Sequence, residues 1–364
     1  MAERGTRPDV SRTHRRLLRA AGVLFTPLLP DDYVELINPL WSTRELRGRV
    51  EAVEPETEDS VTVVIRPGWV WPGHVPGQYL RVGVVVEGVH HWRAYSLTSD
   101  PGRPDGCISI TPQLLPAGKV SPYLVRAVRP GTIVRLGGVE GDFTLPDPLP
   151  RSLLFISAGS GVTPIMSMLR DLDRRDGLLD VVHLHSARTA GRFVFGSQLL
   201  ALADRRPGYR LHLQLTEADG RLSPIDLDHL CPDWRTRTTL ASGPGAMLDD
   251  LAASWKRAGV GDRLRMERFQ PVIDGHAAGA GGAISFSKSR ARTSSDGSVP
   301  ILVAGERAGL DLDYGCRMGI CRTCVGRLSS GRVRDLRTGK VSGQPGEIVR
   351  TCINAPEGPI EIAL

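Results

Sequence analysis

The chain has 364 residues, of which 41% are hydrophobic and 24% are charged, and this balance excludes a disordered chain. At roughly 150 residues per domain, the length predicts two or three domains. The net charge of +6 is small, and beyond the first twenty residues the basic side chains are scattered. Because this distribution lacks the concentrated basic face of a nucleic-acid-binding protein, we expect no nucleic-acid partner.

Residues 1–46 are expected to form an N-terminal helical extension. Within it, residues 11–25 mix arginines with apolar side chains, and Pro27 ends the pattern. This segment is interpreted either as a basic amphipathic helix that touches a membrane or a partner, or as a tail or docked helix, which we favour. The stretch 17–25 is too short for a membrane span and lacks a cleavage site, so a signal peptide is not expected. We therefore expect a cytoplasmic protein, with peripheral contact at the inner face of the membrane as a further hypothesis.

Residues 47–149 carry short apolar alternations separated by glycine and proline, as at 61–65, 79–86 and 91–97. Further short candidates follow at 107–111 and 132–136. Short strands at this spacing predict an antiparallel β-barrel.

Residues 150–269 change to an alternation of apolar strands with helical patterns, which predicts an α/β domain with a parallel sheet. The expected strands and helices are 153–157, 164–174, 181–185, 198–203, 211–215, 239–242 and 246–256. A linker rich in glycine, alanine and serine is expected over 270–284, and a third domain over 285–364.

The third domain contains four cysteines in the spacing C-x₄-C-x₂-C…C, namely Cys316, Cys321, Cys324 and Cys352. This is the plant-type spacing of [2Fe–2S] ligands. A structural zinc site is the alternative, but zinc ligands usually come in two close pairs, so we favour the iron–sulfur cluster. Cys107 and Cys231 have no such context and are interpreted as ordinary buried thiols.

The two cysteine loops read Asp313-Tyr314-Gly315-Cys316 and Val349-Arg350-Thr351-Cys352. With these loops, the last eighty residues resemble a plant-type ferredoxin domain. The resemblance implies an α+β fold of the β-grasp type.

The barrel carries the sequence Arg93-Ala94-Tyr95-Ser96 at the end of an expected strand. Alternation places Arg93 and Tyr95 on one face, where an arginine can bind phosphate and a tyrosine can stack on a planar ring. Gly118-Lys119-Val120-Ser121 opens an expected short helix, whose N-terminus favours anions.

Together with Gly77-Gln78-Tyr79 and Gly141-Asp142-Phe143, these motifs resemble the flavin-binding barrel of the ferredoxin–NADP⁺ reductase superfamily. The resemblance implies that Arg93, Tyr95 and Ser96 contact the flavin and its phosphate. It also implies that the loop with Gly118, Val120 and Ser121 holds the pyrophosphate. We expect FAD, with FMN as the alternative.

The α/β domain begins with Ser157-Ala158-Gly159-Ser160-Gly161-Val162-Thr163-Pro164, a glycine turn between an expected strand and helix. We expect Thr163 to cap this helix and Pro164 to occupy its first position. The turn differs from G-x-G-x-x-G. It resembles the pyridine-nucleotide loop of the same superfamily, which implies that Gly159, Gly161 and Thr163 bind the cofactor.

The resemblance also implies that Ser186 and Arg188 face the adenosine ribose, where an arginine suits the 2′-phosphate of NADPH. NADPH is therefore favoured, with NADH as the alternative. Ser242-Gly243 stands where many relatives have Cys-Gly beside the nicotinamide, so a serine replaces the thiol. Glu267-Arg268-Phe269 matches a family segment for which we predict no role. His183 and His185 alternate on a strand without a third ligand in view and are interpreted as ordinary strand residues.

This order of domains predicts an electron-transfer reductase. A hydride passes from NAD(P)H to FAD, and single electrons pass through the [2Fe–2S] cluster to an acceptor protein. Residues 30–42 resemble a bacterial subgroup that reduces membrane-bound di-iron fatty acyl desaturases, so such a desaturase is the expected partner. The alternatives are a Rieske or other oxygenase as the acceptor, and a non-enzymatic redox sensor. Five arginines near the cluster loop predict an acidic docking surface on the acceptor, namely Arg317, Arg322, Arg332, Arg334 and Arg337.

Overall fold

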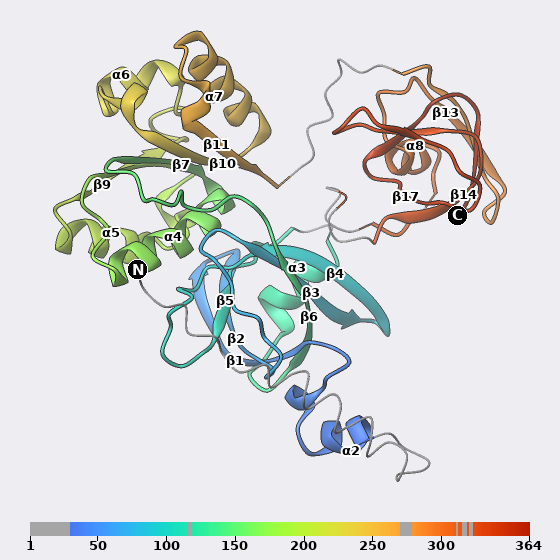
Figure 1. The fold of residues 1–364 in the computed structure, drawn as a ribbon, viewed down its shortest axis with the longest axis horizontal. Helices are drawn as coiled ribbons and strands as arrows, with labels where there is room; N and C mark the ends of the chain where they lie inside the picture. The colour runs from blue at the N-terminus through green and yellow to red at the C-terminus, as the bar shows by residue number, and fades with distance from the viewer. Residues whose placement is uncertain (1–29, 116–117, 270–278, 311, 315–318, 320–322) are drawn as a thin grey trace.

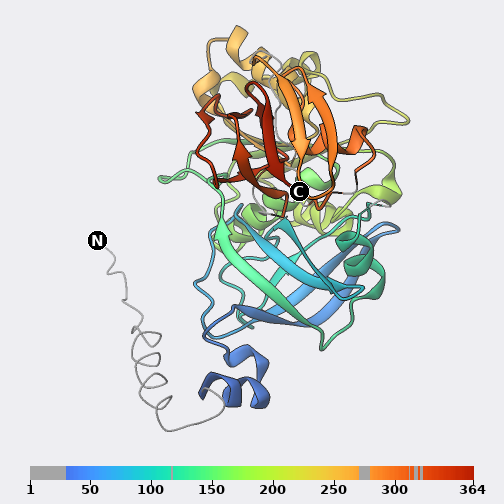
Figure 2. The same cartoon turned by 90° about the vertical axis from the view of Figure 1, so that its right-hand side faces the viewer.

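The computed structural model describes residues 30–115, 118–269, 279–310, 312–314, 319 and 323–364. A short N-terminal helical segment precedes three domains, each built on a β-sheet (Figures 1 and 2). Among the described residues, no helix is both long and apolar enough to cross a membrane.

The N-terminal segment consists of helix α2 (Pro30–Ile37) and the 3₁₀ turn η1 (Pro39–Trp41). Asn38 caps η1 by accepting a hydrogen bond from the N–H of Leu40 at 3.0 Å. Leu40 is buried, whereas Leu36 and Ile37 are exposed. Both views place α2 at the end of the first domain that lies away from the other two domains. The helix expected within 11–25 lies outside the described residues.

The first domain is the predicted antiparallel barrel, with strand order β4-β3-β6-β1-β2-β5. Its strands are β1 (Arg47–Thr57), β2 (Ser60–Pro67), β3 (Tyr79–Val86), β4 (Val89–Ser96), β5 (Ile108–Ile110) and β6 (Ile133–Glu140). A bridge between Leu97 and Ile110 joins the two edges and closes the barrel. The short helix α3 (Val120–Pro122) and the π-helical turn η2 (Tyr123–Ala127) precede β6.

The second domain is a parallel sheet with strand order β11-β10-β7-β8-β9, as the alternating pattern predicts. Its strands are β7 (Leu153–Ala158), β8 (Val181–Ala187), β9 (Tyr209–Leu215), β10 (Thr238–Gly243) and β11 (Leu264–Arg268). Its helices are α4 (Val162–Arg174), α5 (Gly196–Arg205), α6 (Leu227–Leu230) and α7 (Gly245–Arg257). Short 3₁₀ turns are η3 (Gly159–Gly161), η4 (Ala190–Arg192), η5 (Pro224–Asp226), η6 (Trp234–Thr236) and η7 (Gly261–Arg263). Separate apolar cores form with α4 and α5 and with α6 and α7, so both faces of the sheet are covered.

The third domain combines a five-stranded mixed sheet, β13-β12-β19-β14-β17, with a three-stranded sheet, β16-β15-β18. Its elements are β12 (Gly282–Phe286), β13 (Ala291–Ser295), α8 (Ile301–Arg307), β14 (Val325–Ser330), β15 (Val333–Asp335), β16 (Val341–Ser342), β17 (Ile348–Arg350), β18 (Asn354–Pro356) and β19 (Ile360–Ala363). The expected boundary at residue 285 falls inside β12. Ile284, one residue before that boundary, is buried and pairs with Ile360, so it already belongs to the third domain.

Candidate functional site

Strand β4 brings Arg93, Tyr95 and Ser96 to one edge of the barrel. It pairs with β3 in regular antiparallel register, with Arg93 opposite Val82 and Tyr95 opposite Leu80. This regular pleat keeps Arg93 and Tyr95 on the predicted common face. Burial raises the pKa of Tyr95, so its phenol is neutral and suited to ring stacking. Arg93 donates from Nη1 to the carbonyl of Trp92 at 2.8 Å, which engages one of its five N–H groups.

The loop before α3 lies next to this strand, since α3 packs against β4. Val120 and Ser121 are buried, and the Ser121 hydroxyl oxygen accepts a hydrogen bond from the N–H of Leu115 at 3.0 Å. A Cβ on Gly118 would lie 3.2 Å from that hydroxyl, so the loop is tight. The predicted flavin residues of two segments are therefore neighbours, with Lys119 adding a positive charge.

Helix α4 attaches the second domain to the residues that directly follow β4. Ser167 donates to the carbonyl of Ser99 at 2.7 Å, and Arg170 donates to the carbonyl of Thr98 at 2.6 Å. Arg174 forms an ion pair with Asp100 at 2.7 Å. Because α4 begins at the glycine turn, these contacts hold that turn beside the flavin strand.

The glycine turn itself is η3, which connects β7 to α4. Gly159 has φ +54°, a left-handed conformation that favours glycine. A Cβ on Gly161 would overlap the carbonyl oxygen of Ser242 at the end of β10. The turn therefore lies directly against the Ser242-Gly243 segment.

The prediction that Thr163 caps α4 is wrong. The helix begins at Val162 after Gly161, because η3 winds directly into it and moves its start toward the N-terminus. The Thr163 hydroxyl instead donates to the carbonyl of Ser160 at 2.9 Å, and Pro164 occupies the third helical position. Both residues stay within the first turn.

A buried polar network lies beneath this turn. The Ser157 hydroxyl contacts Nε2 of His183 at 2.8 Å and Nδ1 of His185 at 2.7 Å, and Tyr209 contacts Nδ1 of His183 at 2.8 Å. Burial lowers the pKa of His185 to about 3, and both histidines are neutral at pH 7. Both rings lie on strand β8 and form hydrogen bonds inside the sheet, which fits their interpretation as ordinary strand residues.

Three polar side chains at the carboxyl ends of the parallel strands are buried without a hydrogen-bond partner among the described residues. They are Ser186 on β8, Ser242 on β10 and Glu267 on β11. Ligands of open parallel sheets bind at this edge, and a bound ligand would supply the missing partners. These orphaned atoms fit a bound nicotinamide nucleotide.

Sequence reasoning found no role for Glu267, because strand β11 was not predicted. Glu267 lies opposite Ser242 in the β10–β11 register. Burial raises the pKa of its carboxyl to about 8, and the nearby charge of Asp142 in the first domain acts in the same direction. The carboxyl is therefore protonated at pH 7 and can donate a hydrogen bond where the two domains meet.

Unlike Ser186, Ser242 and Glu267, Arg188 is neither buried nor without a partner. It follows β8, its side chain is 66% exposed, and its guanidinium forms an ion pair with Glu217 at 2.7 Å. To bind a phosphate, Arg188 would exchange this carboxylate for the ligand.

The described cysteines of the third domain come together from two adjoining loops. Cys324 and Cys352 are both buried, and the N–H of Thr351 donates to the carbonyl of Cys324 at 2.8 Å. Gly319 has φ +72°, and its carbonyl accepts a hydrogen bond from Arg350 at 2.8 Å. Buried thiols on loops joined in this way fit a [2Fe–2S] cluster; Cys316 and Cys321 lie outside the described residues.

Of the five arginines expected to face the acceptor, one described residue, Arg334, is wrongly predicted. Arg334 is buried, forms an ion pair with Glu357 at 3.1 Å and donates to the carbonyl of Gly297, so it cannot face an acceptor. Arg317 and Arg322 lie outside the described residues. Cys107 and Cys231 are buried as expected, and burial raises the pKa of both thiols.

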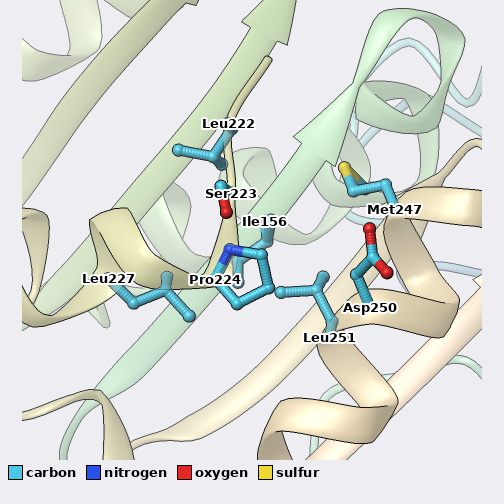
Figure 3. A pocket seen from close by; sticks show the side chains of 8 residues that line it. All are labelled: Ile156, Leu222, Ser223, Pro224, Leu227, Met247, Asp250 and Leu251. Carbon is cyan, nitrogen blue, oxygen red and sulfur yellow. The ribbon is translucent and has the colours of Figure 1, made fainter.

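The second domain also contains a pocket (Figure 3). It is lined mainly by apolar side chains of β7, α7 and the segment around η5, including Ile156, Met247 and Leu251. The Ser223 hydroxyl on its wall caps η5. None of the predicted site residues lines it.

Comparisons with known proteins match both outer domains. The model of the oxidoreductase FAD-binding domain matches residues 72–145, and that of the 2Fe-2S iron-sulfur cluster binding domain matches residues 287–357. The chain is 48% identical to an NADPH oxidoreductase of Mycobacterium tuberculosis over 360 residues, 97% of this chain and 94% of that protein. It is 26% identical to a glycine betaine monooxygenase reductase subunit of Chromohalobacter salexigens, over 79% of this chain and 86% of that protein.

Among solved structures, phthalate dioxygenase reductase has the same fold. The TM-score is 0.60 at 19% identity, and the match covers 88% of this chain and 98% of that one.

The contact between Gly161 and Ser242 predicts that Gly161→Ala disrupts nucleotide binding. The added Cβ must displace the β10 backbone, at a cost of about 1–3 kcal/mol in stability. Flavin reduction by NADPH, followed by stopped-flow absorbance, should slow by at least tenfold, a factor that corresponds to about 1.4 kcal/mol. In Gly261→Ala, the control, the Cβ meets no atom within 4 Å. Equal rates in the two variants would contradict the prediction.

The raised pKa of Glu267 predicts a pH dependence of stability. Between its ordinary value of 4.5 and about 8, the folded protein keeps a proton that the unfolded chain releases. The free energy of unfolding therefore falls as pH rises through this window and levels off above it. Glu267→Gln should flatten this decline in thermal unfolding scans, and the exposed control Glu361→Gln should not. Parallel curves for wild type and Glu267→Gln would show that the carboxyl titrates normally.

Proposed function

The chain belongs to the family of ferredoxin–NADP⁺ reductase-type flavoproteins with a C-terminal plant-type [2Fe–2S] domain, and for this member we propose NADPH as the donor and a membrane-bound di-iron fatty acyl desaturase as the acceptor. The protein is an NAD(P)H oxidoreductase that uses FAD and a [2Fe–2S] cluster. That catalytic activity sets the sensor hypothesis aside.

The proposed electron path, from the nucleotide through the flavin to the cluster, is supported mainly by one observation. That observation is the attachment of α4 to residues 98–100. When bound, FAD accepts a hydride and releases single electrons, which the cluster carries onward. The chain's own residues position these groups. Arg93 and Lys119 offer positive charge to the flavin phosphates, Tyr95 offers its ring face, and Ser96 lies at the end of the same strand.

On the nucleotide side, the turn Gly159–Gly161 offers backbone N–H groups at the start of α4. Ser242 and protonated Glu267 offer buried hydrogen-bonding atoms at the neighbouring strand ends. Because α4 is fixed to the residues after β4, the proposed flavin site and the proposed nucleotide site keep their relative positions. A direct hydride transfer requires such a fixed arrangement.

The donor preference is proposed to depend on Ser186 and Arg188. The orphaned hydroxyl of Ser186 and the exposed guanidinium of Arg188 suit a ribose phosphate. The name of the 48% identical relative, NADPH oxidoreductase, supports NADPH.

An anaerobic titration tests both the path and the donor. NADPH should bleach the flavin and cluster bands of the wild-type visible spectrum faster than NADH does. Arg188→Ala should raise KM for NADPH roughly tenfold, because a charge-assisted hydrogen bond contributes about 1.5 kcal/mol or more, while KM for NADH changes little. Arg221→Ala, at an exposed arginine of the same domain, is the control. Equal effects of Arg188→Ala on both nucleotides would exclude a phosphate contact.

The membrane-bound acceptor is supported by an exposed apolar patch at the N-terminal segment. Leu36 is 77% exposed and Ile37 is 75% exposed, and the nearby Trp41 and Trp69 are 42% and 44% exposed. The N–H of Trp69 donates to the carbonyl of Leu40, so the two tryptophans belong to one surface. The preceding residues 1–29 contain six arginines and two acidic residues, a composition that suits an anionic lipid surface.

A soluble oxygenase is the second candidate acceptor, because the 26% identical relative is named as the reductase subunit of a glycine betaine monooxygenase. The two candidates differ in whether the exposed patch is needed.

The patch predicts binding to vesicles that contain anionic lipid. Leu36→Glu should weaken sedimentation with such vesicles roughly tenfold or more, since a buried leucine gains about 1.5–3 kcal/mol on leaving water. Electron delivery to a desaturase in the vesicles should fall with it, while reduction of a soluble acceptor stays at the wild-type rate. Leu179→Glu, at a leucine 78% exposed on the second domain, is the control. Undiminished delivery by Leu36→Glu would favour a soluble acceptor.

A further inference from the structure

Tyr314, two residues before the first cysteine of the cluster loop, contacts the barrel. The guanidinium carbon of Arg93 lies 5.7 Å from the centroid of the Tyr314 ring. This distance is within the range of a cation–π contact. The contact joins the third domain to β4, the strand that carries the proposed flavin residues.

Charges of both domains gather around the same contact. Burial lowers the pKa of His91 on β4, and Lys119 and Arg93 act in the same direction, while the carboxylate of Asp313 opposes them. Asp313 is therefore close enough to act on the barrel's side chains. Its negative charge complements the positive charges of Arg93 and Lys119.

Strand β4 is suited to receive another domain. It stands first in the strand order of the barrel sheet, next to β3. Its neighbour on the other side is the bridge that follows Ser96, so most of its length is an edge. An edge strand presents backbone groups and side chains that a covering element can protect.

We propose that Tyr314 is a positioning residue that docks the third domain on the flavin strand through the Arg93 guanidinium, with Asp313 facing the basic groups of the barrel. The proposal rests on the proposed function, because it assigns Arg93 to the flavin phosphate as well. One guanidinium then serves both contacts, since a ring binds its face while a phosphate binds its N–H edge. Tyr314, which leads into the first cysteine, is thereby held beside the strand that carries the proposed flavin residues.

The step that depends on this docking is electron transfer between the two cofactors. In each transfer, one electron would leave the NADPH-reduced flavin for the oxidised cluster, and the cluster would pass it to the acceptor protein before the next transfer. Two transfers, with loss of the flavin's two protons to solvent, restore the oxidised flavin. Docking changes the rate of these transfers and leaves the hydride step from NADPH unchanged.

Tyr314→Leu removes the ring and Tyr314→Phe keeps it, so the two variants separate docking from a general effect of substitution. In anaerobic stopped-flow experiments on the holoenzyme, Tyr314→Leu should slow cluster reduction roughly two- to fivefold, the factor expected for one exposed cation–π contact. Flavin reduction by NADPH should stay at the wild-type rate, and Tyr314→Phe should match the wild type in both steps. Tyr33→Leu, on α2, is the control.

A second measurement reads docking without turnover. Hydrogen exchange of the peptide that covers residues 89–96 should increase in Tyr314→Leu and stay unchanged in Tyr314→Phe. Unchanged exchange and unchanged cluster reduction in Tyr314→Leu would overturn the proposal, and so would equal losses in the Leu and Phe variants. Failure of NADPH to bleach the wild-type flavin would instead contradict the proposed function.

If Tyr314→Leu loses the absorbance bands of its cluster, the variant cannot report on docking. The variant Asp313→Asn then tests the proposal. Removal of this charge should slow cluster reduction and weaken its dependence on salt concentration, because the attraction to Arg93 and Lys119 is screened. A salt dependence identical to that of the wild type would overturn the proposal. Glu361→Gln, at an exposed acid of the same domain, is the matched control.

Discussion

The attachment of α4 to the residues after β4 is the constraint on which the rest of the molecule depends. Three side chains of one helix, Ser167, Arg170 and Arg174, contact three consecutive residues, 98–100. Hydrogen bonds to backbone carbonyls, and not apolar packing alone, set the angle and register of the two domains. The glycine turn at the start of α4 and the strand that ends at Ser96 are thereby parts of one rigid arrangement.

A second layer of polar contacts supports that arrangement from inside the parallel sheet. Ser157 bonds two neutral histidines of the next strand, and Tyr209 contacts His183 from the strand beyond, while Nε2 of His185 has no partner among the described residues. Buried polar groups that are paired in this way specify one strand alignment, because any shift would leave them unsatisfied. The network therefore fixes the positions of the strand ends that carry Ser186 and Ser242. The hydroxyl groups of these two serines have no hydrogen-bond partner among the described residues.

The three-domain architecture and the main motifs were predictable from the sequence, because each depends on local pattern. Alternating apolar residues marked the barrel strands, and strand–helix alternation marked the parallel sheet. The start of α4 was not predictable, since η3 continues into the helix and leaves Thr163 inside it. Glu267 was missed for a different reason. Its raised pKa depends on burial at a strand end beside β10 and on the charge of Asp142 in another domain, and no local pattern records either neighbour.

If Arg188 binds the ribose phosphate as proposed, its ion pair with Glu217 affects both the binding and the release of the nucleotide. Both side chains are more than half exposed, so the pair contributes only about 0–1 kcal/mol. The pair nevertheless restrains a long side chain in the absence of ligand, and less rotamer freedom then remains to be lost when a phosphate replaces the carboxylate. Glu217 acts in this sense as an internal substitute for the phosphate. In that proposed role, the same carboxylate would compete with the bound phosphate for Arg188, which would favour exchange of the spent nucleotide over its retention.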